Sequence, residues 1–490
     1  MRSGKEYLDS LDDGRTVIID GEPVENVREH PAFKGLTRSV AALFDISADP
    51  DNGFQVYNEE IGKNVNRLFY APKSREELTE RRKVIEKWAE YSHGWLGRTP
   101  DHVSSFLAGF AARSDLYGQE DGHDYAANVL TYQAEAAAND WYITYAIVPP
   151  QISRATTASG WEGEFLQVGV VKETEEGLIV RGSQMLATAS PVTDEILVTC
   201  IKPLSPDDSD VALSFALPIA TTGLKLYSRR PYAPAATSSF DYPLTTRFDE
   251  SDCLVVFDDV LVPWDRVFIN QNVEKTKLQF FDTPAHVLGN WQAQIRLATK
   301  LKFIAAVAHK ATQINQTNRI PGVREKLGEL AALATSVESA VLASEYTAEI
   351  DKSGTCVPGA KALYSSMGLQ SEVYPRVINI LRDLVGGGVL QLPSSVKDLE
   401  SDFTKDDVAR YVQSPGTPST ERVKLFKLAW DILGSEFGGR HQQYEMFYAG
   451  APFIVKGVYA YQNFDYPAAV ADLDDFLNSY GPDGPISEEG

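Results

Sequence analysis

The sequence predicts a mainly helical protein with a central β-domain, and three observations support this fold class. Residues 1–148 and 279–490 contain long segments whose apolar residues recur at spacings of three and four, the pattern of amphipathic helices. Residues 149–278 instead contain short β-branched runs separated by Pro, Gly, Asp and Ser. The chain has no strand–GxGxxG–helix unit and no GxxxxGK[ST] loop, so a doubly wound nucleotide-binding sheet is poorly supported.

Two long segments of the N-terminal region are predicted to be helical. The first is SREELTERRKVIEKWAEYSHG, residues 74–94, in which Ser74 and Glu77 have the spacing of a capping box. The second is YAANVLTYQAEAAANDWYITYAIV, residues 125–148, which is rich in alanine. We expect this second helix to continue as far as the Pro-Pro pair that follows it, because proline cannot extend a helix.

The middle region is predicted to consist of strands. FLQVGVVKETEEGLIVRGSQMLATA, residues 165–189, indicates a strand, a turn at Glu175-Glu176-Gly177 and a second strand. EILVTCI, VALSFALPI and CLVVFDDVLVP are further short runs rich in β-branched residues. Together these segments predict a β-domain within residues 149–278.

The C-terminal region is predicted to be a bundle of long helices followed by a polar tail. Three segments have the spacing of packed bundle helices: HVLGNWQAQIRLATKLKFIAAVAHKATQI, VREKLGELAALATSVESAVLASEYTAEI and ERVKLFKLAWDILGSEFGG. The tail GPDGPISEEG has little apolar surface to bury. The predicted domains are therefore 1–148, helical; 149–278, β; and 279–490, helical bundle with its tail.

Composition limits the possible partners and compartment. The net charge is −22, and the chain has no run of Lys or Arg that could follow a phosphate backbone, so nucleic acid is not expected as a partner. We expect no membrane span, since we find no apolar stretch near the roughly 20 residues that one needs. The N-terminus lacks an apolar signal core. The three cysteines, Cys200, Cys253 and Cys356, are far apart, so we predict no disulfide framework, no metal site and a cytoplasmic location.

The stretch LGRTPDHV, residues 96–103, places an arginine, a proline, an aspartate and a histidine together just after a strongly amphipathic segment. Only seven histidines occur in the chain, and His102 is four residues after Arg98. The stretch is either an ordinary loop between helices or one wall of a pocket. The residues alone leave both interpretations open.

Several longer strings resemble one family of enzymes. They are MRSGKEYLDSL, LGRTPDHV, FDDVLVPWDRVF, REKLGEL and LAWDILGSEFGGRHQQYEMFYAG, and they extend over nearly the whole chain. All resemble the large oxygenase component of 4-hydroxyphenylacetate 3-monooxygenase. That family is similar in fold to the acyl-CoA dehydrogenases, with an N-terminal helical domain, a middle β-barrel and a C-terminal four-helix bundle. The order of helical, β and helical regions here agrees with that architecture, although fold alone says little about chemistry.

The resemblance implies a two-component flavin-dependent monooxygenase. Such enzymes take reduced FAD (FADH2) from a separate NAD(P)H:flavin reductase, by diffusion of the reduced flavin. They react it with O2 to a flavin C4a-hydroperoxide and hydroxylate a phenol ortho to its hydroxyl group. Members are usually homotetramers. The sequence leaves open the aromatic substrate, the reductase, the choice between FADH2 and FMNH2, and the choice between dimer and tetramer.

The resemblance also implies which residues contact the flavin. Arg154 would be a countercharge for the flavin phosphate, and Thr188 a hydroxyl partner for the ring. Without the resemblance, an arginine after a helix break is more often a surface charge, and a strand threonine is usually only a β-former. The implied contacts are Tyr145, Ala146, Ile147, Gln151, Ile152, Ser153, Arg154, Thr188, Phe447, Tyr448, Ala449 and Gly450.

Three residues are implied to act on the substrate: Arg98, His102 and Tyr145. A cation and a proton acceptor around a phenolic oxygen would favour phenolate, which is the electron-rich form that electrophilic attack needs. The family usually has tyrosine where this chain has His102, and histidine where it has Tyr145. The two side chains look exchanged, which preserves the set if both positions face the substrate. The alternative is that His102 only packs or caps at a loop.

A second departure from the family is Trp291, in GNWQAQIR, where relatives often have histidine. Tryptophan offers only an N–H donor and a large flat surface. The pocket would then be more aromatic and the substrate not necessarily a simple phenol. Trp291 could equally belong to the core of the bundle, which is the commoner location of a helical tryptophan.

Three alternatives to this function follow from the same fold. The related 4-hydroxybutyryl-CoA dehydratases need an iron–sulfur cluster, and this chain has no cysteine near the corresponding positions. An acyl-CoA dehydrogenase needs a catalytic carboxylate in the bundle, for which Glu436 or Glu445 could be proposed. A relative that binds flavin but has altered catalysis is the third alternative.

Overall fold

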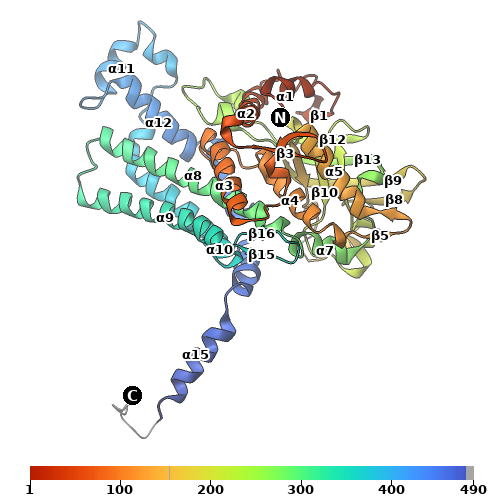
Figure 1. Ribbon diagram of the computed structural model, residues 1–490. Helices are drawn as coiled ribbons and strands as arrows, with labels where there is room; N and C mark the ends of the chain where they lie inside the picture. The colour runs from red at the N-terminus through yellow and green to blue at the C-terminus, as the bar shows by residue number, and fades with distance from the viewer. Residues whose placement is uncertain (154, 482–490) are drawn as a thin grey trace.

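The computed structural model describes residues 1–153 and 155–481 (Figure 1). It confirms the predicted order of a helical region, a β region and a second helical region. Residues 482–490, most of the predicted polar tail, lie outside the described residues, as does Arg154. The three predicted domain boundaries themselves remain a prediction.

The N-terminal region consists of helices around a buried aromatic and aliphatic core. Ser74 begins α3 as predicted, because its hydroxyl accepts a hydrogen bond from the backbone N–H of Glu77 at 3.2 Å. The Glu77 carboxylate bonds to the N–H of Lys73 instead of completing a capping box. The helices are α1 (Gly4–Ser10), α2 (Lys34–Ala48), α3 (Arg75–Tyr91), α4 (Pro100–Ala112) and α5 (Tyr125–Asn139). The short hairpins are β3 (Gln55–Asn58) with β4 (Lys63–Asn66), and β5 (Gln119–Glu120) with β6 (His123–Asp124).

The middle region forms two sheets, and strands from the N-terminal region contribute to both. The six-stranded sheet has the order β2-β1-β12-β13-β9-β8, and the four-stranded sheet the order β14-β11-β10-β7. The first sheet comprises β1 (Val17–Ile19), β2 (Glu22–Pro23), β8 (Gly169–Glu173), β9 (Gly177–Thr188), β12 (Leu224–Ser228) and β13 (Asp252–Pro263). The second comprises β7 (Ile143–Ala146), β10 (Glu195–Thr199), β11 (Ser214–Pro218) and β14 (Val267–Ile269). The predicted strand–turn–strand of residues 165–189 is confirmed by the antiparallel pair β8 and β9.

One prediction about this region was wrong. The helix expected to continue to residue 148 ends at Asn139, where Asp140 adopts a left-handed conformation (φ 53°) as the C-cap. An aspartate tolerates this conformation better than most residues, and it ends the helix. The following β-branched and aromatic residues then form β7, which pairs in parallel with β10. Tyr145 therefore lies on a strand and not on a helix.

The C-terminal region is a bundle built around α8, α9, α10 and α12, which pack against one another. The predicted helix at residues 421–439 is divided at Gly434 into α12 and α13. The long helices are α8 (Ala285–Ile314), α9 (Pro321–Tyr346) and α10 (Ala360–Val385), and the shorter ones are α7 (Val273–Phe281), α11 (Lys405–Tyr411), α12 (Ser419–Leu433) and α13 (Glu436–Phe447). Beyond α14 (Pro452–Ile454) and a π-helical turn (Val455–Ala460), α15 (Tyr466–Asn478) extends away from the body as an arm (Figure 1).

The helix α9 corrects the expectation that the chain has no apolar stretch long enough to span a membrane. By length and composition alone, this helix is long and apolar enough to cross a membrane, with 22% of its apolar window buried. Its first turns nevertheless carry Arg324, Glu325, Lys326 and Glu329. It packs against α8 and α10 in the bundle, which is an ordinary setting for an apolar helix of a globular domain.

The helix α4 brings the three regions together. It packs against α8 of the bundle, α5 of the N-terminal region and β7 of the four-stranded sheet. Pro100 occupies the first turn, where a missing N–H costs nothing, and every residue from Pro100 to Ala111 is buried. The stretch LGRTPDHV is therefore the buried start of a helix at the junction of the regions.

Candidate functional site

The backbone before α4 is held in place by a buried carboxylate. The N–H groups of Gly97 and Arg98 donate to the carboxylate oxygens of Glu250 at 2.8 and 2.7 Å. The hydroxyl of Tyr142 donates to the carbonyl oxygen of Arg98. Glu250 also pairs with Arg440 of α13 at 3.3 Å. These contacts fix where the Arg98 side chain begins.

The Arg98 guanidinium lies among aromatic rings. Its Nη1 donates to the hydroxyl of Tyr444 at 2.7 Å. Its Cζ is 5.5 Å from the ring centre of Tyr145, 5.2 Å from that of Tyr444 and 5.3 Å from that of Tyr448. Burial opposes the charge, but the three tyrosine hydroxyls outweigh it and raise the pKa of Arg98. Within residues 1–153 and 155–481, no carboxylate lies within 4 Å to form an ion pair with it.

His102 and Tyr145 lie next to each other beside this cation, with their ring planes tilted by 53°. The Nε2 of His102 is 3.4 Å from the Tyr145 hydroxyl, and its Nδ1 is 3.1 Å from Oε1 of Gln292 on α8. Burial, together with the Arg98 charge, lowers the pKa of His102 well below its usual value, so the ring is neutral. The structure thus brings together the two positions whose side chains the resemblance predicts to be exchanged.

Trp291 does not take part in this cluster. It is completely buried, and its Nε1 donates to the carbonyl oxygen of Val341 on α9 at 3.3 Å. Successive residues of a helix point about 100° apart, so the next residue, Gln292, faces α4 instead. Of the two interpretations of Trp291, the structure supports the bundle core.

The implied flavin contacts on the middle sheets lie close to one another. The Thr144 hydroxyl donates to the carbonyl oxygen of Thr188 at 2.7 Å, which joins β7 to the end of β9. The Thr188 hydroxyl donates to Asp252 at 2.7 Å, and Asp252 also accepts from Arg440 at 2.7 Å. Tyr145, Ala146, Ile147 and Thr188 thus form one group. Gln151, Ile152 and Ser153 follow β7 at the surface, and Arg154 lies outside the described residues.

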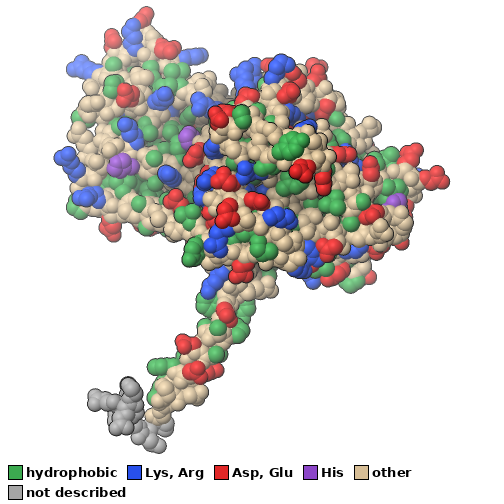
Figure 2. All heavy atoms as spheres, viewed as in Figure 1, with side chains coloured by type: hydrophobic (Ala, Val, Ile, Leu, Met, Phe, Trp, Pro, Cys, Tyr) green, Lys and Arg blue, Asp and Glu red, His purple; other side chains and the backbone are tan. Residues whose placement is uncertain are grey.

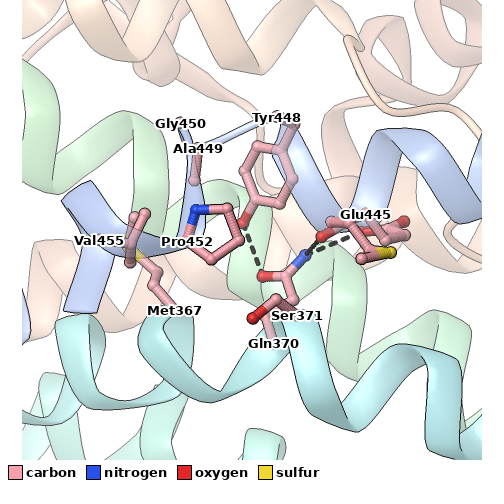
Figure 3. A pocket seen from close by; sticks show the side chains of 10 residues that line it. Met367, Gln370, Ser371, Glu445, Tyr448, Ala449, Gly450, Pro452 and Val455 are labelled. Carbon is pink, nitrogen blue, oxygen red and sulfur yellow. Dashed lines mark hydrogen bonds between the residues drawn. The ribbon is translucent and has the colours of Figure 1, made fainter.

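The last implied flavin segment, Phe447 to Gly450, begins with the last residue of α13. Figure 3 shows Tyr448, Ala449 and Gly450 lining a small pocket against α10. The Tyr448 hydroxyl donates to Gln370 at 3.1 Å and accepts from Gln294 at 2.9 Å, while Phe447 is exposed. Since Tyr448 also lies beside Arg98, this segment meets the β7 group around the guanidinium.

Sequence reasoning missed a cluster of charges next to the site. Glu445 of α13 forms ion pairs with Arg296 and Lys300 of α8, each at 2.7 Å, and all three are fully buried. The Lys300 ammonium also lies 3.0 Å from Nδ1 of His441. Burial would raise the pKa of Glu445, but the two cations lower it to about 2. The signal was present in the sequence, because both helices contribute two of these residues four apart, on one face.

Two family models match this chain. The one described as "4-hydroxyphenylacetate 3-hydroxylase N terminal" matches residues 3–269, and the one described as "4-hydroxyphenylacetate 3-hydroxylase C terminal" matches residues 276–478. The chain belongs to the 4-hydroxyphenylacetate 3-hydroxylase family. The resemblance inferred from the sequence strings is confirmed.

Curated relatives and solved structures agree. The 4-hydroxyphenylacetate 3-monooxygenase oxygenase component of Thermus thermophilus is 35% identical, over 92% of each chain. A Streptomyces globisporus monooxygenase of a carrier-protein-bound (3S)-3-amino-3-(3-chloro-4-hydroxyphenyl)propanoyl group is also 35% identical, over 91% of this chain and 85% of that one. A solved oxygenase component complexed with FAD and 4-hydroxyphenylacetate has a TM-score of 0.92 at 33% identity, covering 98% of both chains.

More distant structures confirm the fold class only. A 4-hydroxybutyryl-CoA dehydratase superposes with a TM-score of 0.88 at 19% identity, and an acyl-CoA dehydrogenase with 0.52 at 13%. The fold is therefore acyl-CoA dehydrogenase-like, as predicted. Together with the family assignment, the relatives identify the chain as an enzyme, the oxygenase component of a flavin-dependent aromatic monooxygenase.

Proposed function

We propose that this enzyme hydroxylates a phenolic small molecule ortho to its hydroxyl group, and that Arg98, His102 and Tyr145 bind the phenolic oxygen. The observation that carries the proposal is the Arg98 guanidinium, which is buried and has no carboxylate partner among the described residues. A buried cation without a counter-ion is costly, and such groups are concentrated at sites that bind a ligand. A phenolic oxygen acquiring negative charge is the complementary ligand.

A neighbour of Arg98, the His102 imidazole, can accept the phenolic proton. His102 is neutral and so has one ring nitrogen that can accept a hydrogen bond. The Tyr145 hydroxyl, 3.4 Å from Nε2, lies where a phenolic hydroxyl would compete for the same nitrogen. The guanidinium and the imidazole would together withdraw the proton and stabilise the oxygen, which activates the ring carbon ortho to it.

The residues at β7 and at the end of β9 fit a flavin. β7 is an edge strand, so its outer N–H and C=O groups can bond to the polar edge of an isoalloxazine ring. The Thr188 hydroxyl donates its proton to Asp252 and therefore offers its lone pairs as an acceptor. FADH2 with O2 would supply the oxygen atom transferred to the ring. Tyr145, Ala146, Ile147, Gln151, Ile152, Ser153, Arg154 and Thr188 would hold the flavin, together with Phe447, Tyr448, Ala449 and Gly450.

The reductant would come from a separate NAD(P)H:flavin reductase by diffusion of reduced flavin, and we place the enzyme in the cytoplasm. We infer a homotetramer, supported by α15. This arm has no buried residues and exposes Val470, Leu473, Phe476 and Leu477. Figure 2 shows hydrophobic side chains along it, interleaved with acidic ones. A 13-residue helix is only marginally stable in isolation, so a second copy of the chain would cover this face.

The bundle carboxylates do not favour an acyl-CoA dehydrogenase reaction. A base for that chemistry must take up a proton, whereas Glu445 is held ionised by Arg296 and Lys300 with a pKa of about 2. Glu436 is exposed and pairs with Arg230. Neither carboxylate is available as a buried base.

One experiment tests the proposed function. The purified protein is mixed anaerobically with FADH2, then with oxygen and a panel of phenols, while absorbance is followed by stopped flow. We expect a transient near-ultraviolet absorbance that belongs to neither reduced nor oxidised FAD, and an ortho-diol product from at least one phenol. Immediate return to oxidised FAD with stoichiometric peroxide, whatever the phenol, would contradict the proposal.

A further inference from the structure

A chain of buried hydrogen bonds leads from α4 through α8 back to His102. The Thr99 hydroxyl donates to Oδ1 of Asp101 at 2.5 Å, and Nε2 of Gln292 donates to the same oxygen at 3.0 Å. The other end of the Gln292 amide, Oε1, lies 3.1 Å from Nδ1 of His102. Asp101, Gln292 and His102 are each at most 2% exposed, so water does not compete for these bonds.

The polarity of this chain follows from the carboxylate. An ionised Asp101 can only accept hydrogen bonds, so it must face the N–H end of the Gln292 amide. The carbonyl end of Gln292 then faces His102, and a carbonyl oxygen can only accept. Nδ1 of His102 must therefore carry the proton, which leaves Nε2 with a free lone pair toward Tyr145.

We propose that Asp101 and Gln292 are positioning residues that hold His102 in its Nδ1–H tautomer, so that Nε2 accepts the proton of the phenolic hydroxyl. This inference rests on the proposed function. During hydroxylation the proton leaves the phenolic oxygen for Nε2. Nδ1 keeps its own proton and continues to donate it, as a hydrogen bond, to Oε1 of Gln292. The imidazolium returns the proton to solvent when the product leaves. Neither Asp101 nor Gln292 was identified from the sequence.

The charged and titratable groups around His102 are consistent with this role. Arg98, before α4, and Arg296, on α8, both oppose a charge on the imidazole, as does burial, and together they lower the pKa of His102. The facing groups are Tyr145 on β7 and Asp101 on α4. Burial raises the pKa of Asp101 to about 6, against the hydrogen bonds from Thr99 and Gln292. Asp101 is thus mostly ionised at neutral pH, the state that fixes the tautomer.

The first test reads the tautomer directly and needs no catalysis. The protein is labelled with 15N-histidine, and the His102 signals are identified by their loss in His102→Phe. At pH 7.5 we expect a protonated, pyrrole-type Nδ1 and an unprotonated, pyridine-type Nε2. A pyrrole-type Nε2 would overturn the inference even if the enzyme hydroxylates phenols. The expected tautomer in a protein that hydroxylates no phenol would instead contradict only the proposed function.

The second test changes the relay. Gln292→Met removes its three side-chain hydrogen bonds, to His102, Asp101 and Thr99, so we expect a mixture of tautomers and about a tenfold loss of product formed per FADH2 oxidised. The double variant Asp101→Asn/Gln292→Glu moves the carboxylate from residue 101 to residue 292. Since a carboxylate oxygen can only accept, Nδ1 of His102 must still carry the proton. We expect this double variant to restore the tautomer and most of the yield. Its adjacent negative charge should raise the pKa of His102 and move the acid limb of hydroxylation to higher pH.

A matched control separates positioning from stability. Gln133 on α5 is also a buried glutamine, and it donates to the carbonyl oxygen of Phe69 at 2.6 Å, outside the site. Gln133→Met should lose a comparable amount of stability in urea and keep the wild-type tautomer and yield. If Gln292→Met behaves like Gln133→Met, or if the folded double variant is no better than Gln292→Met, the positioning role is wrong. The wild-type spectrum decides the matter if a variant does not fold.

Discussion

Two buried clusters of charge lie next to each other beside α13, and their cations have different kinds of partner. In the paired cluster (Arg296, Lys300, His441, Glu445), two cations share one carboxylate at 2.7 Å. In the open cluster (Arg98, His102, Tyr145, Tyr444), the cation has aromatic rings and a hydroxyl around it but no carboxylate among the described residues. Tyr444 contacts both, with its ring centre 5.2 Å from the Arg98 Cζ and 5.4 Å from that of Arg296.

The difference separates a structural charge from one reserved for a ligand. A cation neutralised inside the protein has little attraction left for a substrate, whereas removing its partner destabilises the fold. A cation left open costs stability in the free protein, and part of that cost is regained when an anionic oxygen binds. In the free protein, cation–π contacts with the tyrosine rings reduce the cost in stability of the unpaired guanidinium. Substitutions in the two clusters should therefore affect different measurements.

The largest expected effect is on catalysis in the open cluster. Arg98→Ala should lower hydroxylation by about 1000-fold, since one preorganised charge donor near a developing oxyanion contributes that much. Oxidation of FADH2 should continue and yield hydrogen peroxide, because that reaction does not need the phenol. The measurement is product and peroxide formed per FADH2. Arg98→Lys should recover little, as lysine lacks the planar fork. Normal product yield in Arg98→Ala would show that LGRTPDHV is only a structural segment.

The next largest effect is on stability in the paired cluster. Glu445→Gln keeps the size of the side chain but leaves the buried Arg296 without a counter-ion, and it removes the carboxylate that supports a charge on Lys300, whose pKa burial already lowers to about 7. The unfolding free energy should therefore fall by about 3 kcal/mol. Urea unfolding followed by circular dichroism measures it. Arg98→Ala, in the open cluster, should change the same quantity by about 1 kcal/mol or less. If Glu445→Gln and Arg98→Ala lose the same unfolding free energy, the two clusters do not differ in their contribution to stability.

The pH dependence of stability sharpens the comparison. The pKa of Glu445 is about 2 in the folded protein, below its ordinary 4.5, so its contribution is complete above pH 4.5 and is lost as pH falls toward 2. Asp101 has the opposite sign. Its pKa is raised from 3.8 to about 6, so its contribution decreases as pH rises through that window. Between pH 4.5 and 2, urea midpoints should therefore fall less steeply with acid in Glu445→Gln than in the wild type, and about as steeply as the wild type in Arg98→Ala.

The sequence predicts those features of this molecule that depend on residues close together in the chain, and it misses those that depend on contacts between distant residues. Helix periodicity is local, and it correctly indicated the bundle and the helix at residues 75–91. The strand β7 was missed because its alanine-rich approach continues a helical pattern, and only its pairing with β10 favours the extended form. The contact between Arg98 and Tyr444 joins residues 346 positions apart, which no local pattern contains.

The candidate site shows the same limit. The resemblance supplied Arg98, His102 and Tyr145, and the structure places them together, but the resemblance did not supply the hydrogen-bond partners of His102. The sequence did not predict a role for Gln292, because its neighbour Trp291 is the more conspicuous departure from the family pattern. Which of two adjacent helical residues faces α4 depends on how α8 packs, and that is a tertiary property.

A smaller effect should appear in flavin binding. Thr188→Val deletes the hydroxyl that links Asp252 to the proposed flavin site and keeps the β-branched shape. Losing about one hydrogen bond, or about 1 kcal/mol, should weaken FADH2 binding roughly fivefold. Anaerobic fluorescence titration measures the dissociation constant, with Thr199→Val on β10 as the control. Unchanged affinity would mean that the flavin does not contact Thr188.

The smallest effect is expected from exchanging two residues of the open cluster. Tyr145→Phe removes one hydroxyl and should cost about 1 kcal/mol in hydroxylation. His102→Tyr and Tyr145→His should each do worse, because each leaves two like side chains where Nε2 of His102 and the Tyr145 hydroxyl are now 3.4 Å apart. The double variant His102→Tyr/Tyr145→His restores one imidazole and one phenol, in the arrangement that the resemblance predicts for the family. If both positions face the same substrate oxygen, the double change must be milder than the sum of the single changes, by about 0.5 kcal/mol or more in a double-mutant cycle. The imidazole at position 145 would lie beyond the reach of Gln292, so the double variant should also lose its dependence on Gln292. Strict additivity would mean that the two side chains act on different groups and that their exchange has no bearing on the substrate.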